Sequence, residues 1–433
     1  MKDLRTDLLA LHYSKVNNNQ QEIQQKLIQR TLRYATENVP YYSSFCSHGN
    51  SSLELSSFPV VDKQLIRKNP DLFTSRKKDH ILYHEALTGG TTGEPFRFLL
   101  SNAADGFYQI KLWKRCGYKR GQRILAMDGT VLTTEQQQRG DFGGVRKPSR
   151  VYMSDQLPYG GFFLSSLYYT DENSKKYLEL FQQAAPDFIR GYPSFVYLFG
   201  QYIISQHVTL KKPIRCIELT SEAWYEYQID LIKEAYQCDH IVFQYGHSEC
   251  SVFGYTFDNT YAYKTEPLYG YTEVLKEDGS PAEPGETGEI IVTSFYNDVM
   301  PFIRYRTGDY AVVGKPQNGE QILTKILGRK QDYLYDPEGT PLALTGLIPG
   351  HEFTPYNHIE KWQLEQSIPG TVEIRIIKRE GYSHSDEDYI IRFFKENGNI
   401  DASISYVDEI PLTSRGKSLL LIQHISPQAE SGK

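Results

Sequence analysis

Between residues 123 and 246, short β-prone runs alternate with segments long enough to form helices. The runs cover residues 123–127, 188–193, 214–219 and 241–246, and each ends in a polar or glycine-containing loop. Strands that alternate with helices at this spacing favour a largely parallel α/β sheet with helices on its faces. Because ligands bind such sheets at the carboxyl ends of the strands, the loops after residues 219 and 244 are the first places to look for chemistry.

The chain on either side of this region has a different pattern. Apolar residues recur at helical spacing over residues 21–38, and Pro40 ends this predicted N-terminal helix. After about residue 267, closely spaced β-prone runs joined by Gly-, Pro- and Asp-rich turns indicate an antiparallel subdomain. Farther on, we expect a strand at residues 372–376, a charged helix and a final strand pair around residues 411–422.

These changes of pattern predict an α/β protein with two domains. At 433 residues the chain exceeds the size at which a single hydrophobic core keeps growing. We expect a large N-terminal domain, residues 1–329, with mostly parallel sheets, helices and the antiparallel β subdomain. A small mobile α+β domain, residues 330–433, would follow it.

Composition excludes several partners. With 47 basic and 53 acidic residues the net charge is -6, so nothing attracts the chain to nucleic acid in general. No stretch approaches the roughly 18 apolar residues of a membrane span, and the N-terminus has no signal-peptide core, so we expect a cytoplasmic protein. The five cysteines form no Cys-x-x-Cys pair, which favours reduced structural thiols over a disulfide framework or a zinc ribbon.

Three motifs carry polar groups in candidate ligand-binding loops. The glycine–threonine loop at residues 88–93 can wrap a polyphosphate, but it lacks the lysine of a Walker loop. Glu249, just past a predicted strand, offers a carboxylate that can hold Mg²⁺. Asp309, after Gly308, could accept hydrogen bonds from a ribose diol. Taken singly, each is better explained as a tight turn with a solvated side chain.

Taken together and in order, these motifs resemble the adenylate-forming enzymes. The match includes residues 220–224, 245–249, 301–309, 328–329 and 411–417, and it extends from about residue 20 to about residue 420. The combination of residues 245–249 with 269–271 and 300–301 is similar to the CapK-type members of the phenylacetate-CoA ligase-like branch, which are associated with surface-polysaccharide biosynthesis.

The resemblance implies an ATP- and Mg²⁺-dependent ligase that converts a carboxylic acid into an acyl-adenylate and releases pyrophosphate. The acyl group would then pass to a nucleophile, with the thiol of coenzyme A the first candidate. Alternative acceptors are an amino sugar or a carrier-protein thiol. Adenylyl transfer is a further alternative, and an inactive nucleotide-binding scaffold is an alternative from another class. A homo-oligomer is compatible with the sequence.

The resemblance also implies roles for individual residues. Lys417 would be the catalytic lysine of the mobile domain, and Glu249 would hold Mg²⁺. His247 is a candidate for the acyl pocket, for a base, or for a simple hydrogen-bonded histidine. Glu94 departs from the family pattern, because many relatives carry lysine there. The implied nucleotide-binding residues are Thr88, Gly89, Gly90, Thr91, Thr92, Gly93, Ser221, Glu222, Ala223, Tyr245, Gly246, Ser248, Asp309 and Arg329, and the hinge candidates are Lys330, Gln331 and Asp332.

Overall fold

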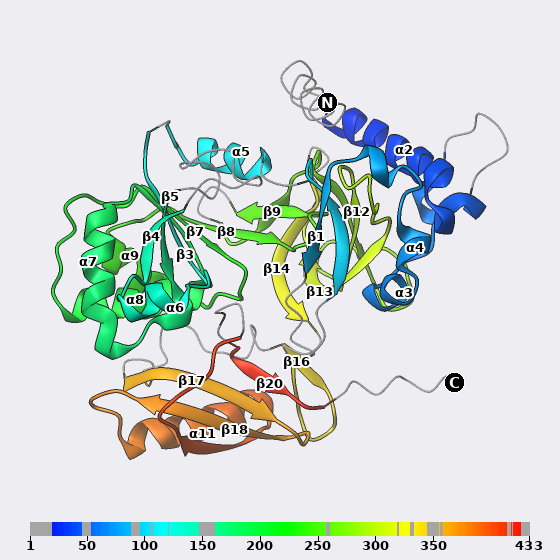
Figure 1. The fold of residues 1–433 in the computed structure, drawn as a ribbon. Helices are drawn as coiled ribbons and strands as arrows, with labels where there is room; N and C mark the ends of the chain where they lie inside the picture. The colour runs from blue at the N-terminus through cyan, green and yellow to red at the C-terminus, as the bar shows by residue number, and fades with distance from the viewer. Residues whose placement is uncertain are drawn as a thin grey trace. The chain divides into compact units, whose positions relative to one another are not determined.

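The chain folds into two compact units, one formed by Met1–Trp113 with Phe243–Ile326 and the other by Lys114–Val242 with Leu327–Lys433. The structure is a computed structural model (Figure 1). It describes residues 20–45, 53–87, 96–104, 107–119, 121–146, 161–256, 260–317, 320–329, 333–343, 355, 358–413, 417 and 419–425. The predicted domain boundary near residue 330 stays a prediction. Within the described ranges, no helix has the length and apolar character needed to cross a bilayer.

The first unit carries the predicted N-terminal helix and the antiparallel strands. Helix α2, Gln20–Asn38, buries Ile23, Ile28 and Leu32 on one face, as its spacing predicts. The other helices are α3 (Lys63–Lys68), α4 (Pro70–Phe73) and α5 (Phe107–Arg115), which continues into the second unit. The strands are β1 (Tyr83–Leu87), β2 (Arg97–Ser101), β8 (Ile241–Gly246), β9 (Phe253–Thr256), β10 (Tyr263–Thr265), β11 (Gly270–Leu275), β12 (Thr287–Ser294), β13 (Tyr305–Val313) and β14 (Ile322–Arg329).

The strands after residue 241 are ordered β11-β12-β13-β14-β10-β9-β8. The pairs β11–β12, β12–β13, β14–β10, β10–β9 and β9–β8 are antiparallel, which agrees with the predicted subdomain. Arg304 fixes the turn before β13, where its own backbone takes the left-handed φ of 47°. Its guanidinium lies 3.0 Å from Glu273 and donates to the carbonyl oxygen of Phe58 at 3.0 Å. This motif arginine is therefore a structural residue.

The second unit contains the predicted parallel sheet. Its strands β7-β6-β3-β5 are parallel neighbours, and β4 pairs antiparallel with β5 at the edge. Figure 1 shows α7, α8 and α9 beside β3, β4, β5 and β7. Gly200 lets α8 pack closely on α9, because a Cβ there would lie 3.2 Å from the Cβ of Ala235. The elements are β3 (Ile124–Asp128), α6 (Thr134–Gln138), β4 (Gly143–Arg146), β5 (Gly161–Ser165), α7 (Ser174–Ala184), β6 (Phe188–Gly191), α8 (Pro193–Ser205), β7 (Cys216–Thr220) and α9 (Glu226–Tyr236).

The C-terminal part of the second unit has its own core. Its sheet has the order β19-β18-β17-β20, and α11 lies beside β18 (Figure 1). Ile390 and Phe394 of α11 belong to one core with Trp362 and Ile374. Tyr225 and Tyr227, at the start of α9, also pack against this core. The elements are β15 (Tyr333–Tyr335), β16 (Pro341–Ala343), β17 (Ile359–Gln366), β18 (Thr371–Lys378), α11 (His384–Gly398), β19 (Asp401–Tyr406) and β20 (Leu421–Gln423).

The expected final strand pair around residues 411–422 is wrong. Among the described residues of this range, only Leu421–Gln423 forms a strand, and it pairs parallel with β17. Pro411 has no N–H to donate to a sheet, and the amide of Thr413 donates to the carbonyl oxygen of Lys417 at 2.9 Å.

Candidate active site

Tyr245 and Asp309 form a pair in the first unit. Tyr245 lies near the end of β8 and Asp309 in β13, and the tyrosine hydroxyl donates to Oδ2 of Asp309 at 2.8 Å. Gly308 has a φ of 81°, a conformation that glycine adopts without strain. The amide of Asp309 donates to Oγ1 of Thr307 at 3.0 Å, which fixes the aspartate backbone. The pair presents an aromatic ring and a carboxylate in a defined mutual orientation.

Glu249 is the most constrained carboxylate of the predicted motifs. It is 6% exposed, and its two oxygens bond different partners. Oε2 lies 2.8 Å from Nδ1 of His247, and Oε1 accepts a hydrogen bond from the hydroxyl of Tyr305 at 2.8 Å. Burial alone would raise the pKa of Glu249, but the charge and hydrogen bond of His247, with the bond from Tyr305, lower this pKa to about 2. Glu249 is therefore ionised at neutral pH.

The ring of His247 has one bonded and one open nitrogen. Nδ1 pairs with Glu249, whereas Nε2 is buried and has no hydrogen-bond partner in the described part of the chain. A buried polar atom in this state costs free energy until a ligand satisfies it. Beside it, a Cβ at Gly246 would lie 2.7 Å from Nε2 of Gln244, so a side chain there would require Gln244 to shift. Ser248 completes the motif, with its carbonyl oxygen 3.5 Å from the thiol of Cys250.

The donor set around Glu249 fits Mg²⁺. Magnesium in proteins is commonly held by one or two carboxylates, with water and substrate phosphate oxygens completing the shell. Glu249 supplies one ionised carboxylate, and each of its oxygens keeps a lone pair beyond its present hydrogen bond. Its neighbours Tyr305 and His247 hold the carboxylate in one orientation.

A second group lies at the carboxyl ends of the parallel strands in the second unit. Asp128 ends β3, Tyr192 follows β6, and Ser221 follows β7. Because these strands are parallel neighbours, the three residues share one edge of the sheet. Ser221 has a φ of 72°, an uncommon backbone conformation for a serine. Next to it, Glu222 accepts a hydrogen bond through Oε2 from the amide of Ser194 at 3.1 Å, and Ala223 is exposed.

Lys417 reaches this edge from the C-terminal part of the same unit. Its Nζ donates to the carbonyl oxygen of Ser221 at 2.9 Å and lies 5.7 Å from the ring centroid of Tyr192. The amide of Lys417 donates to Oγ1 of Thr413 at 3.0 Å, so Thr413 holds the lysine backbone. The structure thus brings together two predicted site residues that are 196 positions apart.

One residue of this edge, Tyr192, was missed by sequence reasoning. Burial raises the pKa of Tyr192, with smaller contributions from Asp128 and Glu222. Tyr192 and Asp128 follow the same rule as Ser221, since each stands where a parallel strand ends. That rule, applied to every strand and not only to the last two, would have found Tyr192.

The remaining predicted residues are placed only in part. Arg329 is the last residue of β14, after Gly328 with its φ of 81°. The predicted hinge, Lys330, Gln331 and Asp332, lies outside the described residues, as does the predicted phosphate loop, Thr88, Gly89, Gly90, Thr91, Thr92 and Gly93.

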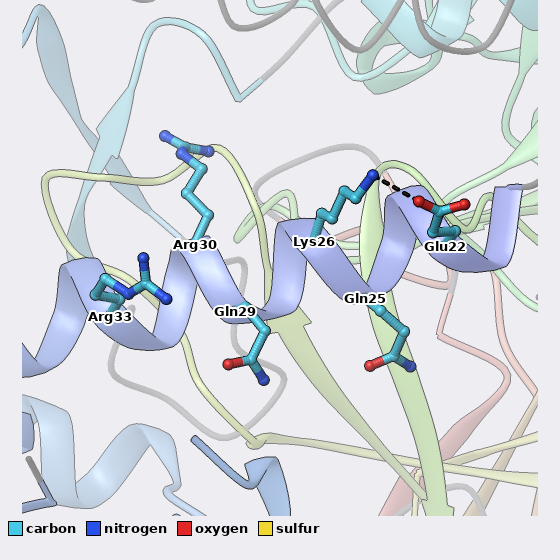
Figure 2. Close-up of a pocket in the computed structure, with 6 residues that line it drawn as sticks. All are labelled: Glu22, Gln25, Lys26, Gln29, Arg30 and Arg33. Carbon is cyan, nitrogen blue, oxygen red and sulfur yellow. Dashed lines mark hydrogen bonds and ion pairs between the residues drawn. The ribbon is translucent and has the colours of Figure 1, made fainter. Parts of the chain in front are cut away.

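A shallow hollow on the exposed side of α2 belongs to neither group. Figure 2 shows its lining by charged and amide side chains of one helix face, with Lys26 paired to Glu22 at 2.6 Å. Arg30 pairs with Asp298 at 2.8 Å. This lining is ordinary helix-surface pairing and presents no constellation suited to catalysis. The lining residues are Glu22, Gln25, Lys26, Gln29, Arg30 and Arg33.

Comparison with known proteins bears on the fold. No family model matches the chain. 2-Hydroxyisobutyryl-CoA ligase in complex with 2-HIB-AMP superposes with a TM-score of 0.69 over 93% of this chain and 89% of that one, at 16% identity. The chain has the adenylate-forming fold. The acyl acid amido synthetase GH3.15 is also similar, with a TM-score of 0.58, 14% identity, and coverage of 93% and 88%.

Among curated proteins, the chain resembles Protein CapK of Staphylococcus aureus. The two are 24% identical over 93% of this chain and 89% of that protein. This similarity and the superpositions confirm the resemblance inferred from the motifs and the predicted α/β fold class.

Proposed function

We propose that this protein activates a carboxylic acid as an acyl-adenylate, using Mg-ATP and releasing pyrophosphate. The observation that carries the proposal is the contact of Lys417 with Ser221 at the carboxyl edge of the parallel sheet. The adenylate-forming fold supports the same chemistry, since 2-hydroxyisobutyryl-CoA ligase has this fold and was solved with 2-HIB-AMP.

Lys417 has the charge and the position to act on two anions. A carboxylate that attacks the α-phosphate of ATP must overcome repulsion between the two negative groups. An ammonium that bridges them lowers this repulsion and orients the attack. In the structure, Nζ donates to the carbonyl oxygen of Ser221 and lies beside the ring of Tyr192. Exchange of that weak acceptor for anionic oxygens would be favourable.

Glu249 is assigned to the metal. Mg²⁺, when bound, neutralises charge on the phosphate oxygens and on the departing pyrophosphate. Glu249 suits this task because its low pKa keeps it ionised and because His247 and Tyr305 fix its orientation. The open Nε2 of His247 would form one hydrogen bond with the acyl group or with a bound water.

The nucleotide contacts are assigned by the resemblance. Asp309 would bond the ribose hydroxyls together with Arg329, and Tyr245 would stack on adenine while its hydroxyl holds Asp309. Ser248 would contact the α-phosphate, and the loop at residues 88–93 would bind the β- and γ-phosphates. The segment Ser221, Glu222 and Ala223 would border the adenine.

We propose the thiol of coenzyme A as the acyl acceptor. The superposition on a coenzyme A ligase supports it. An amine acceptor is the alternative, which the similarity to an acyl acid amido synthetase favours. Dependence of turnover on coenzyme A separates the two. Transfer of labelled AMP into a product would instead indicate an adenylyltransferase.

The deciding experiment measures pyrophosphate release from Mg-ATP over a panel of carboxylic acids, with hydroxylamine as the trap. We expect release with at least one acid and near-complete loss in Lys417→Ala. Lys395→Ala is the matched control, because Lys395 is an exposed lysine of the same C-terminal segment that pairs with Asp401. ATP binding without release for any acid would indicate a scaffold, and equal activity in Lys417→Ala would remove Lys417 from the reaction.

A further inference from the structure

Three segments of the second unit meet at a point that the proposed reaction does not use. Cys116 follows α5, Cys216 is the first residue of β7, and His240 immediately precedes β8. The two sulfurs and a ring nitrogen of His240 all lie within 4.8 Å of one another. Because Cys216 begins the strand that Thr220 ends, this cluster lies at the amino end of β7, away from Ser221 and Lys417.

The backbone holds the members of the cluster in place. The amide of Ile217, next to Cys216, donates to the carbonyl oxygen of His240 at 3.0 Å. This bond ties the start of β7 to the residue before β8. The thiol of Cys238 also lies against that carbonyl, with its sulfur 3.4 Å away. Hydrogen bonds of the backbone therefore fix the positions of Cys216 and His240 relative to each other.

The chemistry of the cluster is that of a thiophilic metal site. Cysteine sulfur and histidine nitrogen are the preferred ligands of Zn²⁺. Around tetrahedral zinc, with Zn–S bonds of about 2.3 Å, neighbouring sulfurs lie about 3.8 Å apart. The observed spread, within 4.8 Å, needs only small side-chain shifts to reach that geometry.

Burial adds a second argument. Cys216 is fully buried, Cys116 is 8% exposed, and both are free thiols in the structure. The hydrogen bond with Cys116 and then burial raise the pKa of Cys216. His240 is the partly exposed member of the cluster.

We propose that Cys116, Cys216 and His240 bind a zinc ion, with water in the fourth position. The ion cross-links the end of α5 to the starts of β7 and β8 and stabilises the second unit. The sequence did not indicate this site, because its members are 100 and 24 positions apart and no Cys-x-x-Cys pair marks them. The proposal is independent of the ligase activity and of Mg²⁺ at Glu249.

The test uses the full chain, purified without a histidine tag and exchanged into metal-free buffer. Metal content should be about one zinc per chain, as for a single site. Cys116→Ser, Cys216→Ser and His240→Asn should each reduce it severalfold. Cys250→Ser is the control, since Cys250 belongs to the other unit, and it should keep its zinc. His240→Asn replaces a partly exposed side chain, so a loss of zinc in this variant is not explained by misfolding of the buried core.

Cobalt provides a readout of the ligands themselves. Co²⁺ added to the metal-free chain should give a thiolate-to-cobalt charge-transfer band and the visible bands of a tetrahedral ion, and His240→Asn should weaken or shift them. Chelation should lower the melting temperature of the native chain by several degrees and that of His240→Asn much less. A native chain that binds neither zinc nor cobalt overturns the proposal, as does full zinc content in all three ligand variants or loss of zinc in Cys250→Ser.

Discussion

The hydroxyl of Tyr305 donates a hydrogen bond to Oε1 of Glu249 across 56 positions of sequence, at 2.8 Å and out of contact with solvent. This contact joins β13 to the segment after β8 and, with His247 on the other oxygen, satisfies a buried charge. A buried carboxylate is costly unless it is paired and hydrogen-bonded. Tyr305 therefore supports both the stability of the first unit and the proposed metal ligand.

Removal of this hydroxyl should destabilise the protein. For Tyr305→Phe we expect a loss of about 1.5–3 kcal/mol in the free energy of unfolding, because the hydrogen bond is made to a buried charged group. Urea denaturation measures the loss. The matched control is Tyr406→Phe, since Tyr406 donates to Glu387 at the same 2.8 Å in an exposed position. Equal effects of the two substitutions would contradict the importance of burial at Glu249.

Glu249 should make stability depend on acid pH. Its pKa in the folded protein is about 2, below the ordinary value of 4.5, so the folded state favours the ionised form. The contribution is fully present above 4.5 and is lost as the pH falls through 4.5 toward 2. Denaturation midpoints compared between native protein and Glu249→Gln across this range measure it. The difference between the two should shrink toward low pH, and a constant difference would rule out the shifted pKa.

The bond from Tyr245 to Asp309 should affect ATP binding more than the chemical step. Tyr245→Phe keeps the ring and removes the hydroxyl that holds the carboxylate. We expect KM for ATP to rise about fivefold, the effect of about 1 kcal/mol, with kcat nearly unchanged. If Asp309→Asn is combined with Tyr245→Phe, the effects should be less than additive. A fall in kcat at unchanged KM would place the pair in the chemical step.

The backbone at Ser221 should be strained. Its φ of 72° suits glycine, and a side chain with a Cβ is disfavoured there. We expect Ser221→Gly to be about 0.5–1 kcal/mol more stable than Ser221→Ala, which keeps the Cβ and so serves as the control. Thermal or urea denaturation measures both. No difference between the two variants would show that the local backbone relaxes without cost.

Much of the fold was predictable because its signals are local. The runs at residues 123–127 and 241–246 are observed as β3 and β8, and the periodic segment 21–38 is observed as α2. These elements depend on apolar periodicity and on turn residues that end a strand or helix, both of which can be read over a few residues. The strand pair predicted after Pro411 was wrong because β20 pairs with β17, and no local pattern encodes such a long-range contact.

The sequence by itself determined which residues stand at the ends of strands and the order of the motifs that resemble adenylate-forming enzymes. Only the tertiary structure decided their partners: Lys417 on the carbonyl oxygen of Ser221, Tyr305 on Glu249, and Cys116 beside Cys216 and His240. The physical reason is that strand propensity is a property of neighbours along the chain, whereas a hydrogen bond or metal cluster depends on how distant segments pack. Many packings are compatible with one pattern of strands and helices, and burial of the complete core selects among them.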